Sequence, residues 1–148
     1  MIANTIDQEI KQAMLAKDQA KLRGLRAIKA AILLAKTEKG QAEELTEETE
    51  MKILQRLVKQ RKESATIYKE QGREDLFAVE QEEIDVINQF LPQQLDSDAI
   101  AQVVARIIAE TGASSIKEMG KVMGLANKEL AGKADGKVIG ELVKAQLG

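Results

Sequence analysis

The sequence predicts an all-α protein, and three observations lead to that prediction. Proline, which interrupts helices, occurs only at Pro92. Aromatic residues make up 2% of the chain, and its apolar residues are mostly aliphatic types that suit helices. No segment has the pattern of a strand bounded by turns. With 148 residues, 44% of them hydrophobic, the chain is long enough for one domain or two small ones.

Helix start and stop signals divide the first 92 residues into four helices. Asp18 and Thr46 are expected to cap the second and third helices, while Gly40, Gly72 and Pro92 end the second, third and fourth. The third helix is expected to span roughly 24 residues, or about 36 Å. The predicted segments are 4–17, 19–39, 47–71 and 73–91. The first segment has apolar residues on one side: Ile6, Ile10, Ala13 and Met14.

Three further helices follow a short linker, PQQLDS, at residues 92–97. Ser97 is expected to cap the fifth helix, and Gly112 follows it. Ser115 and Glu118 have the spacing of a capping box for the sixth helix, and the seventh is expected at residues 136–147. We therefore predict an N-terminal four-helix domain at residues 1–92, which contains a long antiparallel hairpin, and a small three-helix bundle at residues 97–148.

The third and fourth helices each place charge within an apolar face. At 100° per residue, Arg61 falls in the apolar face of the third helix, and Glu80 and Glu83 fall in that of the fourth. Folding the chain back at Gly72 puts Arg61 beside Glu83, with Glu80 one turn away. We interpret the group as a structural ion pair, because an unpaired charge in the seam would be destabilising. The alternative is a carboxylate-pair active site, for which the sequence supplies no other component.

Charged residues occur in blocks elsewhere in the chain. Residues 43–50 carry five glutamates, residues 52–62 carry five basic residues and no acidic one, and residues 73–90 carry six acidic residues and one basic one. Such blocks are usually solvated helix faces, and that is the expectation here. Opposite blocks on neighbouring helices would also attract each other.

The stretch GKADGK at residues 132–137 has the composition of a phosphate-binding loop. It does not match G-x-x-x-x-G-K-[ST], because Ala134 follows Lys133 and Asn127 occupies the position of the first glycine. The pattern favours a helix–helix turn instead. In that turn Gly132 takes a left-handed conformation and Asp135 caps the seventh helix.

The sixth helix carries a lysine stripe beside its apolar side. Lys117, Lys121 and Lys128 fall within about 40° of one another. Gly120 and Gly124 lie between them and the apolar side, where they would let a backbone approach closely. Lys133 and Lys137 follow at the turn, where an anion would offset the unfavourable position of Lys137 in the first turn of a helix. The apolar side is predicted to consist of Ile116, Met119, Val122, Met123, Ala126 and Leu130.

Several motifs together resemble the GatB/YqeY family. They are MGKVMG (119–124), GKADGK (132–137), ELVKAQL (141–147), FLPQQL (90–95), KQRKES (59–64) and GREDL (72–76). The sequence departs from the family pattern at Asn127, where proline is expected, and at Lys133, where arginine is frequent. The resemblance implies the same four-plus-three helix architecture. It also implies kinship with the tail of the B subunit of the glutamine-dependent tRNA amidotransferase, a carbon–nitrogen ligase whose tail contacts tRNA.

Composition bounds the remaining function classes. The chain has no cysteine and no histidine, which removes thiolate nucleophiles and the commonest general base and transition-metal ligand. We expect no catalysis by the chain alone, no cofactor and no metal. The N-terminus lacks a signal-peptide pattern, and a cytoplasmic location is expected. The net charge of −2 means that any nucleic-acid binding must be local.

The sequence thus predicts an accessory protein that binds tRNA or another structured RNA. The residues expected to contact RNA are Lys117, Lys121, Lys128, Lys133, Lys137, Gly120 and Gly124. Two alternatives stay open. In the first, the long hairpin docks on another protein and RNA plays no part. In the second, the chain is an amidotransferase partner that is active only in a complex.

Overall fold

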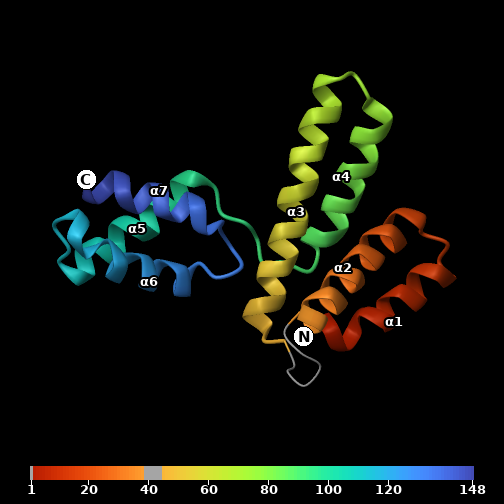
Figure 1. The fold of residues 1–148 in the computed structure, drawn as a ribbon, viewed down its shortest axis with the longest axis horizontal. Coiled ribbons are helices and arrows are strands. Elements are labelled where there is room, and N and C mark those ends of the chain that lie inside the picture. Colours follow the sequence, from red (N-terminus) through yellow and green to blue (C-terminus); the bar gives the residue numbers. More distant parts are fainter. Residues whose placement is uncertain (1, 39–44) are drawn as a thin grey trace. The chain divides into compact units, whose positions relative to one another are not determined.

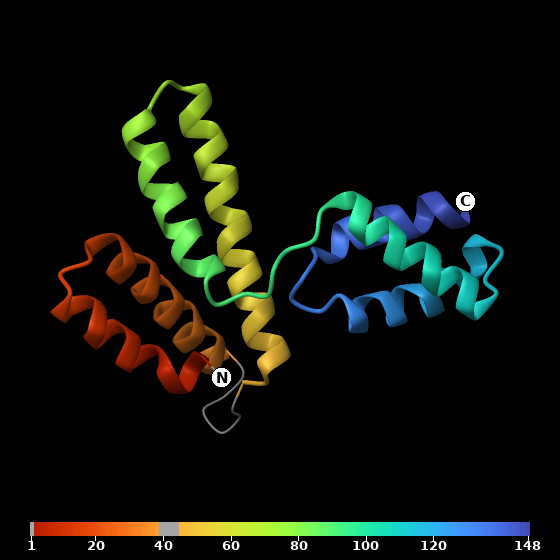
Figure 2. The ribbon, with the colours of Figure 1, turned by 180° about the vertical axis from the view of Figure 1, so that it is seen from behind.

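The computed structural model describes residues 2–38 and 45–148 and divides the chain into two compact units, Met1–Pro92 and Gln93–Gly148. The described residues form seven α-helices and one short 3₁₀ turn, with no strand among them, which confirms the all-α prediction. Figures 1 and 2 show the four helices of the first unit and the three of the second from opposite sides.

The N-terminal unit consists of α1 (Ile2–Leu15), α2 (Gln19–Glu38), α3 (Glu47–Glu70) and α4 (Glu74–Asn88). Their spatial order differs from their order in the chain. The most extensive helix–helix contact is between α3 and α4. α2 packs against α4, and α1 packs against α2. The core lies between these helices, and its largest fully buried side chains are all aliphatic. They are Leu25, Ile28, Leu54 and Ile87, each at most 2% exposed.

The α3–α4 hairpin extends beyond α1 and α2 at its Gly72 end, in both views (Figures 1 and 2). The shared core of the unit reaches Val58 on α3 and Ile84 on α4. Nearer the turn, Ala65 is buried but does not belong to that shared core. The tip of the hairpin is therefore a two-helix structure with exposed sides.

Local hydrogen bonds confirm the predicted helix signals of this unit. Thr46 accepts a hydrogen bond from the Thr49 amide at 3.1 Å, and Asp18 accepts one from the Lys21 amide at 3.1 Å. Gly72 has a φ of 71°, a left-handed conformation that favours glycine. The predicted stop at Gly40 lies outside the described residues.

The fourth helix ends earlier than predicted, at Asn88 instead of Leu91. The amides of Gln89, Phe90 and Leu91 each bond to the carbonyl three residues back, at 3.0–3.2 Å, so the chain tightens into a 3₁₀-type turn. The reason is Pro92, whose ring would clash with the carbonyl four residues before it if the helix continued. That carbonyl belongs to Asn88.

The C-terminal unit consists of α5 (Ser97–Thr111), the 3₁₀ turn η1 (Ile116–Glu118), α6 (Met119–Glu129) and α7 (Gly136–Leu147). Each of the three α-helices packs against the other two. Their shared core includes Val104, Val122, Ala126 and Val143, all with no exposed surface. Ser115 and Glu118 form the predicted capping box.

The cap of α5 corrects one prediction. Asp96, and not Ser97, is the N-cap, and its Oδ1 accepts a hydrogen bond from the Ala99 amide at 2.8 Å. Both residues can cap a helix, but a carboxylate also carries a full negative charge that the positive end of the helix dipole favours. Ser97 becomes the first residue of the helix.

The GKADGK segment is a turn, as predicted. Gly132 has a φ of 76°, and Asp135 caps α7 by accepting a hydrogen bond from the Lys137 amide at 3.0 Å. The linker holds this turn in place. Gln94 donates to the Gly132 carbonyl at 2.6 Å, and the Leu95 amide donates to the Lys133 carbonyl at 3.0 Å.

Three residues of the predicted apolar faces are exposed: Met14 and Ile116, named above, and Val79 on the apolar face predicted for the fourth helix. Met14 is 56% exposed in the last turn of α1, and Val79 is 38% exposed near the tip of the hairpin, where no third helix covers α4. Ile116 is 45% exposed because it lies in η1 and not in α6. A 3₁₀ turn has three residues per turn, so the 100° periodicity used for the sixth helix does not apply there.

Candidate nucleic-acid interface

The predicted lysines lie on three successive elements of the C-terminal unit. Lys117 is in η1, and Lys121 and Lys128 are in α6. Lys133 lies in the turn before α7, and Lys137 is the second residue of α7. All five are exposed.

The two glycines of the predicted strip have open space beside them. A Cβ atom added at Gly120 or Gly124 would meet no atom within 4 Å outside its own local backbone. Both residues are exposed on α6. The helix backbone is therefore accessible between the lysines, and neither glycine is needed for packing against α5 or α7.

The acidic residues of this unit are mostly engaged in its own structure. Of the seven that follow position 92, Asp96 and Asp135 cap helices and Glu118 closes the capping box. Glu110 and Glu129 both bond to Arg106. By contrast, none of the six lysines in residues 93–148 takes part in a salt bridge. The unit has no net charge. Its lysine side chains are nevertheless free of salt bridges, while most of its carboxylates contact helix N-termini or Arg106.

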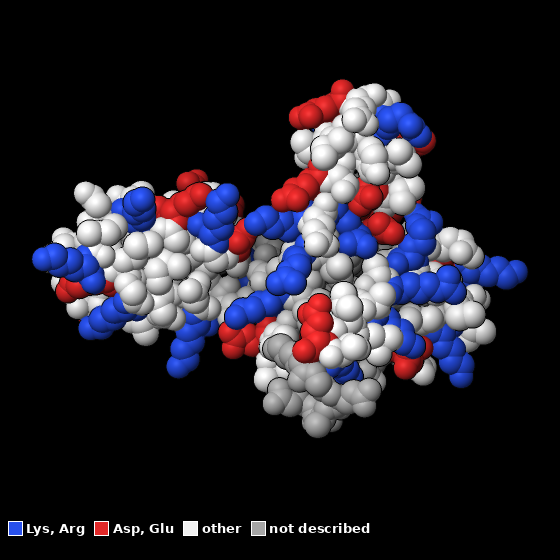
Figure 3. Space-filling model, in the orientation of Figure 1, with Lys and Arg blue, Asp and Glu red and all other residues white. Residues whose placement is uncertain are grey.

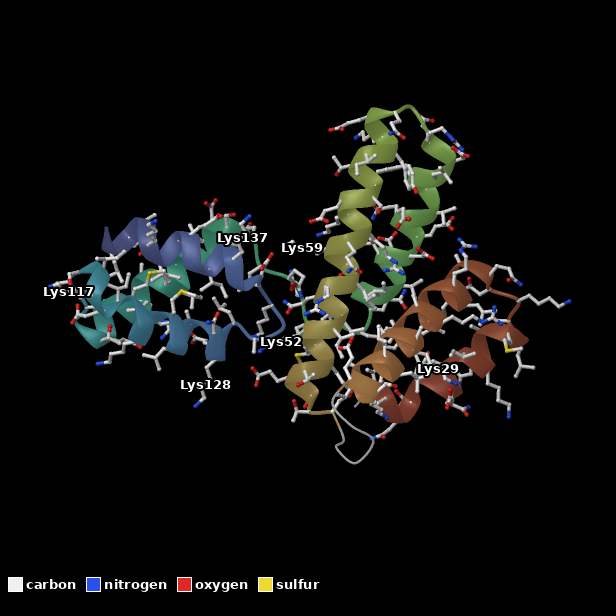
Figure 4. The ribbon with its side chains drawn as sticks, in the orientation of Figure 1. Lys29, Lys52, Lys59, Lys117, Lys128 and Lys137 are labelled. Atoms are coloured by element: carbon white, nitrogen blue, oxygen red, sulfur yellow. The ribbon has the colours of Figure 1, made fainter. Side chains whose placement is uncertain are left out.

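The five lysines do not form one compact patch. Lys117, Lys128 and Lys137 lie at separate places on the C-terminal unit (Figure 4). Its basic side chains project as separate points in Figure 3. The structure groups Lys121, Lys128 and the two glycines along α6, while Lys137 lies at the start of α7. An extended polyanion fits this arrangement better than a single phosphate group does.

The charged residues of the hairpin lie together at its seam. Arg61 Nε donates to Glu83 Oε2 at 3.3 Å, and Arg61 Nη1 donates to the Leu57 carbonyl at 3.3 Å. The side chain of Arg61 is 18% exposed and that of Glu83 is 16% exposed, so the ion pair is only partly shielded from water. The pair joins α3 to α4 across the seam of the hairpin.

Glu80 is the member of this group whose negative charge is disfavoured by its surroundings. Burial raises the pKa of Glu80 above its ordinary value of 4.5, the charge of Glu83 raises it further, and Arg61 opposes both. The folded chain therefore binds more protons at this site than the unfolded chain does. Ionisation of Glu80 lowers the free energy of unfolding as the pH rises through its folded-state pKa, and the penalty is fully present once the pH is above that pKa.

Glu80→Gln should therefore make the protein more stable at pH 7, and the gain should disappear as the pH falls below 4.5, where the unfolded-state carboxyl is also protonated. Urea unfolding at several pH values, followed by circular dichroism, measures the difference. Glu63→Gln is the matched control, because it makes the same charge change at an exposed position of α3. An equal gain from both variants, or a gain that is independent of pH, would contradict the role of burial.

In residues 2–38 and 45–148, no three acidic side chains converge in a way that could hold a metal ion. None of the helices in that part of the chain combines the length and apolar character needed to cross a bilayer.

Gln94 and Leu95 fix the turn that carries Lys133, and no pattern in the sequence predicts this role. Both belong to the linker motif FLPQQL, but their hydrogen-bond partners lie 38 residues further along the chain. Contacts of that range do not leave a local pattern.

Comparison with known proteins covers almost the entire chain. A family model described as "Yqey-like protein" matches residues 3–147. The chain is 34% identical over 100 residues to "Altered inheritance of mitochondria protein 41, mitochondrial" from Meyerozyma guilliermondii. That alignment covers 68% of the chain and 51% of the fungal protein, so it spans about half the length of that relative. The family match over both helical units shows that the chain belongs to the YqeY-like protein family.

Proposed function

We propose that this YqeY-like chain binds structured RNA, such as tRNA, through phosphate contacts along α6. One observation carries the proposal: Lys117, Lys121 and Lys128 are exposed and form no salt bridge in this fully described unit, and the backbone between them is open at Gly120 and Gly124. The resemblance of the C-terminal motifs to a tRNA-contacting tail supports the same partner. A cytoplasmic location remains part of this proposal.

The proposed recognition depends on RNA shape and charge. Residues 93–148 contain no Phe, Tyr or Trp, so no aromatic ring of this unit can stack on a base. Lys121 and Lys128 are two helical turns apart, about 10 Å along the axis. They can therefore contact different phosphates of one folded RNA, whose backbone is read without base contacts.

Lys121→Ala combined with Lys128→Ala should weaken binding to all structured RNAs alike. Each lost phosphate contact should also flatten the slope of log affinity against log salt by about one. α6 should persist, because alanine is a strong helix former and both positions are exposed. Fluorescence anisotropy with labelled tRNA across a salt series measures both effects. Lys11→Ala with Lys52→Ala is the control, with the same charge change at exposed positions of the N-terminal unit.

Gly124→Leu tests close approach separately from charge. The added side chain meets no protein atom at its Cβ, so it should block the RNA backbone while every lysine remains. Removing glycine from a helix interior should also stabilise α6 by up to about 1 kcal/mol. Weaker binding by a more stable protein is thus expected. Absence of tRNA binding by the parent at low salt, or equal salt slopes for the lysine variant and its control, would refute the proposal.

A further inference from the structure

A shallow groove of about 590 Å³ runs along one side of the α3–α4 hairpin near its tip. Its floor is formed by Ala65 and Ile84, which are buried, and by the half-buried ring of Phe77. Its rim consists of exposed side chains of α3 and α4: Lys62, Thr66, Lys69, Glu70 and Gln81. An apolar floor between exposed polar walls is the usual form of a surface that receives another protein segment.

The position of the groove leaves it uncovered within its own unit. Of its floor residues, Ile84 also belongs to the shared core of the unit, whereas Ala65 and Phe77 lie outside that core. Lys69 lies over the Phe77 ring, with Nζ 5.8 Å from the ring centre. The half-buried ring of Phe77 is therefore the part of the apolar floor that is most accessible to an external contact.

The charges on the rim indicate what the groove accepts. Neither Lys62 nor Lys69 forms a salt bridge within the described residues, and neither has an acidic residue bonded to its ammonium group. They lie on the same wall, seven residues apart in α3, which corresponds to about 10 Å along the helix. Glu70 lies at the turn end of the groove and offsets only part of this charge. The rim is therefore complementary to two acidic side chains spaced by two helical turns.

We propose that this groove binds an acidic amphipathic helix of a partner protein. The partner would place apolar side chains on Ala65, Phe77 and Ile84, and two acidic side chains seven residues apart against Lys62 and Lys69. The apolar floor favours a protein over a nucleic acid, because a phosphate backbone gains nothing from it. This inference depends on the N-terminal unit alone and is independent of RNA binding by α6.

The test uses the full-length chain and labelled synthetic helical peptides. The first peptide carries Glu at positions i and i+7 with Leu at i+3 and i+4; a second has Lys in place of Glu, and a third has Ser in place of Leu. We expect binding of the first peptide only, measured by fluorescence anisotropy. Its contacts should perturb the NMR signals of the Ala65 and Ile84 methyl groups and the Phe77 ring.

Reversing the charges of Lys62 and Lys69 tests whether their side of the groove binds the acidic peptide. Lys62→Glu with Lys69→Glu should weaken binding of the first peptide by about tenfold or more, since two attractions become repulsions. Lys52→Glu with Arg56→Glu is the control, because it makes the same charge change on the exposed side of α3 away from the groove. Equal weakening by both pairs would overturn the inference.

Three further outcomes would also overturn it. One is failure of the acidic peptide to bind the parent, and another is perturbation of signals outside the groove only. The third is a different occupant: tRNA affinity or self-association that falls in the Lys62→Glu with Lys69→Glu variant but not in its control. The α6 lysine variant should bind the acidic peptide normally, so failure of this inference is distinguishable from failure of the RNA proposal.

Discussion

Replacing Gly24 by alanine is expected to lower the free energy of unfolding of the N-terminal unit by about 1–3 kcal/mol. Gly24 is buried in α2, where a Cβ atom would lie 2.6 Å from Val86 Cγ1 and 2.7 Å from Val86 Cβ on α4. A rotamer change could move Cγ1 but not Cβ, so α2 and α4 would have to separate. That separation outweighs the gain of about 1 kcal/mol that alanine normally brings to a helix interior.

Gly120→Ala in α6 is the matched control for this substitution. It makes the same chemical change in a helix where the new Cβ meets no neighbour, so it should stabilise the C-terminal unit slightly. Urea unfolding followed by circular dichroism compares the two variants. If Gly24→Ala were as stable as the parent, α2 and α4 would not approach as closely as the structure shows.

Truncation of Glu50 should destabilise the same unit by about 2–3 kcal/mol. Glu50 is 2% exposed, and its Oε2 accepts a hydrogen bond from the Ala3 amide at 3.2 Å. The first amides of α1 have no partner inside their own helix, and the carboxylate faces the positive end of the dipole of α1. Glu50→Ala leaves the Ala3 amide unpaired and opens a cavity.

Two companion variants separate the hydrogen bond from other effects. Glu50→Gln keeps an acceptor oxygen and should retain most of the stability. Glu48→Ala removes an exposed carboxylate from the same turn of α3 and should change stability by no more than about 0.5 kcal/mol. Hydrogen exchange at the first-turn amides of α1 should accelerate selectively in Glu50→Ala. Loss of stability in Glu50→Gln as large as in Glu50→Ala would rule out the hydrogen bond as the cause.

Local chemistry along the chain was sufficient to predict most of the helices. Thr46, Asp18 and Asp135 bond to amides two or three residues away, and Gly72 and Gly132 adopt their left-handed conformations for local steric reasons. Interactions between residues so close in the chain can be predicted from the sequence alone. The same locality explains why a period of 3.6 residues identified the buried faces of most helices.

The errors in the prediction also have local causes. Asp96 and Ser97 are adjacent capable caps, and sequence pattern alone did not decide between them. Pro92 was recognised as a helix stop, but its effect reaches back to the Asn88 carbonyl and ends α4 there. Ile116 was assigned the wrong face because the capping box opens a 3₁₀ turn before α6.

Some parts of the candidate sites could be predicted from the sequence and others could not, again because only local interactions leave a pattern in it. That Lys117, Lys121 and Lys128 lie off the apolar face of their helix follows from periodicity, and the hairpin symmetry was enough to place Arg61 near Glu83. Only the folded structure shows that five of the seven acidic residues after position 92 are engaged in caps or with Arg106. Only the structure shows the groove at the hairpin tip, because it depends on which part of the hairpin α1 and α2 leave uncovered.

What the sequence determined by itself was the set of helices, their caps and the charge on each face. What only the tertiary structure decided was which faces meet. Glu50 belongs to a run of glutamates expected to be solvated, yet the end of α1 buries it. Gly24 carries no mark of its role, since any small residue would suit an isolated α2, and it is the 2.6 Å distance to Val86 that requires glycine. Both roles arise from residues 47 or more positions apart, whose contact depends on how the helices pack and not on any local preference.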